Sequence, residues 1–162
     1  MKKVLSVKNP LSYAICAGIK DVENRSWKTD YRGELYIHSS GNIDYFDFDS
    51  AAMFHTPAAS ADLEKFLADP DPQANFASHP RSIQKFIDFI NFVANWEDKH
   101  SKEYILYRQA IIGKVYLADI VQDSKSSFAI PGQYHWIFTN PELFSNPILY
   151  VKGKLKLFDL NL

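Results

Sequence analysis

The run from Ala110 to Val121 is apolar on both of its faces. Strands that are buried on both faces lie in the interior of a sheet. Other stretches with strand composition occur near both ends of the chain. They are Val4–Val7, Val22–Trp27, Leu35–Ser39, Tyr134–Phe138 and Lys152–Phe158. The pattern predicts a mainly β core in which residues 110–121 form a central strand.

The last of these stretches alternates lysine with leucine. Period two places Leu155 and Leu157 on the inner face of a strand and Lys154 and Lys156 on its outer face. Lysines in this arrangement either extend a cationic surface or protect an edge strand from aggregation.

Helical signals lie near the start of the chain and in its middle. Asn9 is expected to cap a helix that begins with Pro10 and ends at Gly18. The block 42–108 is acidic, contains several prolines and has helical apolar spacing. We interpret this block as a helical insertion on the β core. The length of the chain predicts one domain over residues 1–162.

Composition excludes several classes of protein. The single cysteine, Cys16, rules out an intrachain disulfide and a cysteine-based zinc site. The histidines show no i, i+4 pair and no H-E-x-x-H pattern, so we expect no metal and no cofactor. No apolar run reaches the roughly 20 residues that span a bilayer, and the start has no signal-peptide core. We therefore expect a cytoplasmic protein without a membrane partner.

The charge is unevenly distributed along the chain. The formal net charge is −1, whereas residues 1–40 carry +3, residues 41–100 carry −6 and residues 101–162 carry +2. A near-neutral protein is not expected to bind nucleic acid indiscriminately. The two basic ends indicate either a surface for an anionic partner or a solvated surface with none.

Residues 18–25 form the string G-x-K-x-x-E-x-R. Period two places Glu23 and Arg25 on the same face of a strand. Lys20 is a compact charge, and Arg25 is a planar fork that suits bidentate contact with a phosphate or a base edge. Glu23 can hold Arg25 in orientation or accept a hydrogen bond from a base amine. The alternative is a local surface ion pair without function.

The motif continues into further segments in a fixed order. They are Ser26-Trp27, Tyr31-Arg32-Gly33, Ile37-His38-Ser39, Ile112-Gly113, Gly132-Gln133-Tyr134-His135-Trp136 and Val151-Lys152-Gly153-Lys154. Together they resemble the ASCH domain, named for homology to the activating signal cointegrator, over residues 2–40 and 110–160. The resemblance implies a PUA-like β-barrel (a pseudobarrel) surrounded by α-helices. It also implies a cleft beside the motif that receives RNA or another nucleotide-containing ligand.

The same family includes a cytidine-modification amidohydrolase and members reported to cut RNA. In the amidohydrolase branch, a threonine nucleophile beside the motif lysine stands at the position that matches Glu23. A carboxylate cannot act as that hydroxyl. An enzyme hypothesis for this chain is a ribonuclease or nucleoside amidohydrolase with Lys20 and Glu23 as candidate catalytic residues. Lys20 would stabilise developing negative charge, and Glu23 would act as a general base.

The leading hypothesis is a binding protein for RNA or a nucleotide-like ligand, with DNA as an alternative. Its candidate binding residues are Lys20, Glu23, Arg25, Trp27, Ser39, Tyr134 and Lys152. Trp27 would stack a base or pack in the core, and Tyr134 would reach the cleft or pack in the core. Ser39 would meet phosphate or end a strand. His38 is expected to be a hydrogen-bonded structural residue or a proton carrier.

A third hypothesis is a protein-interaction module. In this hypothesis the acidic, aromatic-rich block 43–98 docks a basic partner. Phe46, Phe48 and Phe54 would then be exposed anchors instead of packing against the barrel.

Overall fold

The computed structural model describes residues 1–9, 11–43, 64–66, 68–79, 84, 107–126 and 128–162. In chain order their elements are β1 (Lys2–Asn9), α1 (Leu11–Cys16), β2 (Val22–Arg25), β3 (Gly33–Ile43), the 3₁₀ helix η1 (Phe76–Ser78), β4 (Ala110–Val121), β5 (Tyr134–Ile148) and β6 (Leu157–Leu160). Among these residues, no helix is long and apolar enough to cross a membrane.

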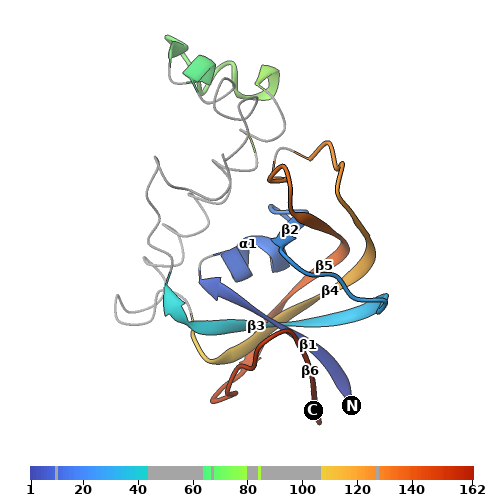
Figure 1. Ribbon diagram of the computed structural model, residues 1–162. Helices are drawn as coiled ribbons and strands as arrows, with labels where there is room; N and C mark the ends of the chain where they lie inside the picture. The colour runs from blue at the N-terminus through green and yellow to red at the C-terminus, as the bar shows by residue number, and fades with distance from the viewer. Residues whose placement is uncertain (10, 44–63, 67, 80–83, 85–106, 127) are drawn as a thin grey trace.

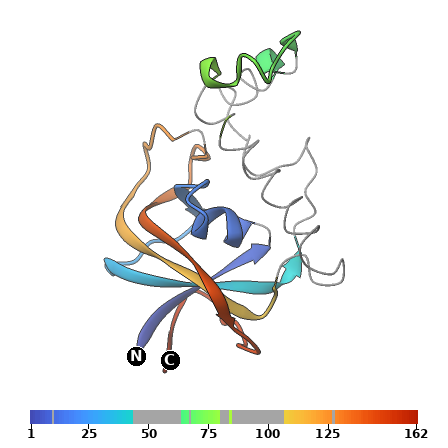
Figure 2. The ribbon, with the colours of Figure 1, turned by 180° about the vertical axis from the view of Figure 1, so that it is seen from behind.

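The strands form one sheet in the order β2-β5-β4-β3-β1-β6. β1 and β3 are parallel, and the other neighbouring strands pair antiparallel. The sheet curls into a half-barrel with α1 inside the curl, as Figure 1 and Figure 2 show from opposite sides. β4 lies between β5 and β3, so the prediction of a central strand at residues 110–121 is confirmed.

The main core lies between α1 and the inner face of the curl. Leu35 and Ile37 of β3 alternate inward and are fully buried, as period two requires. α1 contributes the buried ring of Tyr13, whose hydroxyl accepts a hydrogen bond from the Tyr107 amide at 2.9 Å. Each large apolar side chain buried here contributes about 1.5–3 kcal/mol to stability. The helix is therefore held by packing, because six residues are too few to form a stable helix alone.

The C-terminal residues cover the other face of the sheet. Val4 of β1, Ile111 of β4 and Phe158 of β6 form a second, smaller buried cluster there. The Val151 amide, between β5 and β6, donates a hydrogen bond to the Gln109 carbonyl at 2.8 Å. These contacts fasten the end of the chain to the half-barrel.

β3 and β5 are longer than the sequence predicted. β5 runs to Ile148, well past the predicted end at Phe138, and β3 extends to Ile43. β5 passes through Pro141 and Pro147, and its pairing with β4 contains several register shifts. Proline is tolerated within a sheet at such irregularities, which explains why the pattern ended the strand too early.

The predicted strand at 152–158 is wrong in its boundaries and in its alternation. β6 begins only at Leu157, because it pairs with β1 over Lys2–Leu5. Leu155 is 93% exposed instead of facing inward, and Lys156 has a positive φ of 58°. A residue in the left-handed region interrupts the extended backbone on which period two depends.

The expected ring of helices around the barrel is not seen in the described part of the chain. There, the helical residues outside α1 are 64–66, 68, 76–78 and 84. Most of the predicted helical insertion at 42–108, including its apolar stretch at 86–93, lies outside the described residues. Its role as an insertion and the single-domain organisation over 1–162 stay predictions.

Gly113 of β4 has no room for a side chain. A Cβ atom there would lie 2.2 Å from the carbonyl oxygen of Glu142 and 2.8 Å from Sγ of Cys16. Gly113→Ala should lower the free energy of unfolding by about 1–3 kcal/mol or more, because the backbone of β5 has to move. Gly41→Ala is the matched control, since its Cβ would meet the flexible side chain of Gln109 at 3.2 Å. Urea unfolding measures both variants, and wild-type stability in Gly113→Ala would contradict this packing.

Candidate functional site

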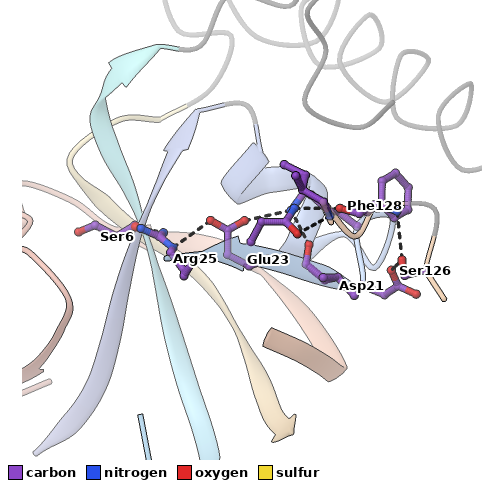
Figure 3. A network of polar contacts seen from close by, with 10 residues as sticks. Ser6, Asp21, Glu23, Arg25, Ser126 and Phe128 are labelled. Atoms are coloured by element: carbon purple, nitrogen blue, oxygen red, sulfur yellow. Dashed lines mark hydrogen bonds and ion pairs between the residues drawn. The ribbon is translucent and has the colours of Figure 1, made fainter. Parts of the chain in front are cut away.

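The sheet curls without closing, and a side chain spans part of the gap. β6 pairs with β1 over Lys2–Leu5, and this pairing stops before Ser6. There Nη2 of Arg25, on β2, donates a hydrogen bond to the carbonyl oxygen of Ser6 at 2.7 Å (Figure 3). We call this gap the seam; it lies between residues 23–25 of β2 and residues 6–8 of β1.

The charged residues of the G-x-K-x-x-E-x-R motif form a chain of ion pairs at the seam. Nζ of Lys20 lies 3.0 Å from Oε2 of Glu23, and Nε of Arg25 lies 3.1 Å from Oε1 of the same carboxylate. The Lys20 and Glu23 side chains are 1% and 10% exposed, and that of Arg25 is 25% exposed. Lys20 also donates to the carbonyl oxygen of Val22. Each carboxylate oxygen of Glu23 thus contacts one cation, which offsets the cost of burying the charges.

The turn after α1 directs Lys20 into the protein. Gly18 has a φ of 77°, the left-handed conformation that commonly ends a helix. The amides of Ile19 and Lys20 both donate to the carbonyl oxygen of Ala14, at 2.9 and 3.0 Å. A Cβ at Gly18 would also lie 3.0 Å from Cγ of Pro141. The glycine of the motif therefore determines where its lysine lies.

A pocket of about 260 Å³ opens at the seam. It is lined by Ser6, Val7 and Lys8 of β1, Leu11 of α1, Glu23, Asn24 and Arg25 of β2, and Ser40 of β3. The lining combines two cationic residues with the Glu23 carboxylate, the Asn24 amide, hydroxyl groups and apolar groups. Because the Glu23 carboxylate is paired with Lys20 and Arg25, the lining suits an anion attached to a small, partly polar ring. The volume lies below the roughly 300–1,000 Å³ of pockets for drug-sized ligands. The pocket therefore fits a small ligand or one unit of a larger one.

Hydrogen bonds to a neighbouring loop fix β2 in place (Figure 3). Nδ2 of Asn24 donates to the Phe128 carbonyl at 2.9 Å, and Oδ1 of Asn24 accepts from the Ile130 amide at 2.8 Å. Oγ of Ser126 donates to Oδ1 of Asp21 at 2.7 Å. Because these contacts lie on both sides of Glu23 in the sequence, they hold the strand that carries the motif.

The other predicted binding residues lie outside the pocket lining. Trp27 packs edge-on against the buried Trp136, with ring centroids 4.7 Å apart. Ser39 is fully buried, and its hydroxyl accepts a hydrogen bond from Ser12. These contacts give Trp27 and Ser39 clear packing roles within the half-barrel.

Tyr134 and Lys152 lie in different parts of the fold. Tyr134 is half-buried and faces Arg25 across the β2–β5 pair. Nζ of Lys28 lies 5.9 Å from the centroid of the Tyr134 ring. Lys152 is exposed on the connection between β5 and β6.

Of the seven predicted binding residues, the structure thus brings Glu23 and Arg25 into the pocket lining, with Lys20 beside them. The ligand contacts of all seven residues stay predictions.

Several lining residues were not identified from the sequence. They are Asn24 within the motif strand and, on the neighbouring elements, Ser6, Val7, Lys8, Leu11 and Ser40. Their place in the pocket depends on the curl of the sheet, which brings β1 opposite β2. The one sequence feature that could have indicated them was Lys8, a basic residue at the end of the first strand.

Two buried histidines have structural roles. Nδ1 of His38 accepts a hydrogen bond from Oγ of Ser6 at 2.9 Å, and its Nε2 donates to a backbone carbonyl at 2.7 Å. Nε2 of His135 donates to the Ile130 carbonyl at 2.7 Å, while Nδ1 accepts from the Ser124 amide at 3.2 Å. The expectation of a hydrogen-bonded structural histidine at position 38 is confirmed.

Cys16 is a packing residue of α1. Burial raises the pKa of its thiol well above the ordinary range, because the thiolate is poorly solvated there. The side chain is 2% exposed and belongs to the main core. Among the described residues, no group of three or more His, Cys, Asp or Glu side chains is placed to hold a metal ion.

Burial lowers the pKa of His38 below the 6.5 of an ordinary histidine. The ring contacts Ser6, Val151 and Phe158, which carry no charge. As the pH falls below about 6.5, the unfolded chain binds a proton at this histidine before the folded chain does. The free energy of unfolding should therefore fall, by at most about 1.4 kcal/mol per pH unit for one proton. Urea unfolding at about pH 7.5 and about pH 5.5 should show a weaker pH dependence in His38→Gln than in the wild type. Equal pH dependence in the two proteins would contradict this assignment.

The buried Lys20–Glu23 pair should respond unequally to single and double substitution. Lys20→Met leaves the buried Glu23 without one of its cations and should lower the free energy of unfolding by about 3–5 kcal/mol. Lys20→Met combined with Glu23→Leu removes both charges and should recover much of this loss. Lys114→Met is the matched control, because its pair with Glu34 is 2.9 Å long but much more accessible to solvent, with side chains that are 30% and 41% exposed, and should cost about 1 kcal/mol or less. A double variant that is less stable than Lys20→Met, measured by urea unfolding, would contradict the energetic role of the pair.

The residues that line the pocket fall within the range that matches a known domain family. The family model described as ASCH domain matches residues 5–148. This range runs from β1 to the end of β5 and includes all the residues that line the pocket. A search of curated proteins found none that matches the chain.

Proposed function

This protein belongs to the ASCH domain family, and we propose that it binds RNA or a nucleotide-like ligand in the pocket at the seam. ASCH domains are PUA-like and are generally implicated in RNA binding. The observation that carries the proposal is the position of Arg25. Its guanidinium lines the pocket while Ser6 and Glu23 hold it from two sides.

Arg25 is well prepared to bind a phosphate. Its contacts with Ser6 and Glu23 use Nη2 and Nε, and Nη1 takes part in neither. The N–H of Nε makes no well-aligned hydrogen bond, although it is buried. A guanidinium that is already oriented loses less freedom when it binds an anion. Lys8 adds a second cationic side chain to the lining.

The remaining lining suits the sugar or base of one nucleotide. A nucleobase has apolar faces and a polar edge, and sequence-specific RNA recognition acts on unpaired bases. Val7 and Leu11 supply apolar surface, and Ser40 supplies a hydroxyl. The small volume of the pocket favours a single nucleotide unit over a duplex.

Lys20 and Glu23 act through Arg25 in this proposal. Lys20 is almost fully buried and contacts Glu23, and Glu23 contacts Arg25. Because both oxygens of Glu23 face cations, the carboxylate is better placed to orient Arg25 than to remove a proton from a substrate. This geometry favours binding over hydrolysis. The alternative of a docking surface on block 43–98 rests mostly on residues outside the described part.

Fluorescence anisotropy with short single-stranded RNA and DNA tests the proposal. Arg25→Ala should weaken RNA binding by about tenfold or more, because a charge-assisted contact with phosphate is lost. Arg32→Ala is the matched control, since this exposed arginine pairs with Asp119 and lies outside the pocket lining. The logarithm of the affinity should fall with the logarithm of salt concentration, with a slope of about −0.7 per neutralised phosphate.

Arg25→Lys separates charge from geometry in the same assay. It keeps the positive charge but removes the planar fork, so its affinity should lie between those of the wild type and Arg25→Ala. Circular dichroism establishes that each variant is folded before binding is measured. Wild-type affinity in Arg25→Ala, or an equal loss in Arg32→Ala, would refute the proposed site.

A further inference from the structure

The connection between β5 and β6 exposes large apolar side chains next to lysines. We call residues 149–156 the basic loop. Its Tyr150 and Leu155 are 94% and 93% exposed. Its lysines, Lys152, Lys154 and Lys156, are exposed as well. Exposed apolar side chains that gather in one segment mark interaction sites, and the lysines indicate an anionic partner.

The middle of the basic loop is held firmly against the sheet. The Val151 carbonyl accepts a hydrogen bond from Nε2 of His38 at 2.7 Å. A Cβ at Gly153 would lie 2.7 Å from Cε1 of His38 and 2.8 Å from Oγ of Ser6, so the backbone is in close contact with both side chains. Tyr150 has a φ of 61°, a conformation unfavourable for tyrosine. The ring is therefore presented to solvent by a fixed and locally strained backbone, as is common at functional positions.

The basic loop also adjoins the pocket. Leu157 pairs with Leu5, which places Lys156 at the level of Ser6, where the pairing of β6 with β1 has ended. Ser6 lines the pocket and accepts the hydrogen bond from Arg25. Gly153 lies against the side chain of the same serine. A ligand that extends from the pocket along the seam would therefore meet the basic loop.

We propose that the basic loop binds the RNA strand that continues beyond the nucleotide in the pocket. The loop lysines would neutralise phosphates, and Tyr150 would stack on a base. This inference rests on the proposed function of the pocket. Aromatic stacking next to backbone-binding cations is the usual combination in proteins that bind single strands. Such contacts add affinity without reading sequence.

Lysines beside exposed leucine and tyrosine would also suit an anionic membrane surface. The position of the loop favours RNA instead. Arg25 is recessed at the seam, with a side chain that is 25% exposed, and a flat bilayer does not reach it. A single flexible strand contacts both the recessed arginine and the protruding loop.

The test compares a short and a long RNA. NMR titration with the dinucleotide UpU detects millimolar binding at the pocket, and fluorescence anisotropy measures an oligouridine of about 12 nucleotides. The wild type should bind the long RNA at least about tenfold more tightly than UpU. Tyr150→Asn removes the ring and keeps the backbone, because asparagine tolerates a left-handed φ. This variant should lose about five- to tenfold in affinity for the long RNA and none for UpU, while Tyr150→Phe should bind like the wild type.

The lysines are tested together. The combined variant carries Lys152→Gln, Lys154→Gln and Lys156→Gln, and should lose most of the gain in affinity with RNA length. Its matched control changes net charge equally at exposed lysines elsewhere, with Lys2→Gln, Lys65→Gln and Lys125→Gln. The affinity of the control variant should still increase with RNA length, and by more than the affinity of the loop variant does.

The outcomes separate the loop from the pocket. If Arg25→Ala weakens UpU binding but the loop variants bind long RNA like the wild type, the inference about the loop is overturned and the proposed function stands. The pocket assignment fails if UpU does not bind, or if Arg25→Ala leaves UpU affinity unchanged, while the loop variants lose affinity for long RNA. The loop then remains an RNA contact. Binding to phosphatidylserine vesicles that the loop variants lose, with unchanged RNA affinity, would overturn the inference in favour of a membrane.

Discussion

The carbonyl oxygen of Ser6 sets the constraint on which the site depends. β6 covers the edge of β1 only as far as Leu5, and the next carbonyl needs another donor. Arg25 supplies it from across the seam, at the same point where the pocket opens. A guanidinium in this position requires a counter-charge, which Glu23 provides, and Glu23 in turn is paired with Lys20. One unpaired acceptor on a strand edge thus accounts for the order of charges in the motif.

The energetic cost of this arrangement supports a binding role. Replacing a buried ion pair with apolar residues of similar volume is often neutral or stabilising, so stability alone gives little reason to keep one. Lys20 and Glu23 are nearly inaccessible to solvent, and they form an ion pair 3.0 Å long. Their geometric effect is to hold the plane of Arg25 at the mouth of a small pocket. In the proposed function, orientation of Arg25 toward a ligand would be a reason to retain charges that folding does not require.

Local patterns predicted the parts of the fold that depend on nearby residues. The central strand at 110–121, a helix followed by a turn at Gly18 and the polar motif on β2 each follow from short-range spacing, although α1 itself ends at Cys16. The pocket needed more, because Ser6 and Ser40 join Arg25 only after the sheet has curled. No spacing rule relates residues on three strands that meet through tertiary structure.

The C-terminal error has a different physical origin. Alternating lysine and leucine at 152–158 indicated a strand, but Tyr150 and Lys156 adopt positive φ although neither is glycine. Sequence rules assign such conformations to glycine or asparagine, so they did not predict a positive φ at a tyrosine or a lysine. Leu155 is exposed as a result, and the same deviation from the pattern creates the basic loop.

The pocket and the basic loop differ in how solvent affects their charges. Arg25 is mostly buried between two strands, where electrostatic interactions are less screened than at the surface. Lys152, Lys154 and Lys156 are exposed. At physiological ionic strength, salt largely screens their interactions with charges more than about 8 Å away. In the proposed complex, the recessed contact would therefore depend on geometry and the loop contacts on ionic strength. Because Ser6 touches both regions, the seam would join, in this proposed complex, a contact that fixes the position of one nucleotide to contacts that follow the rest of the strand.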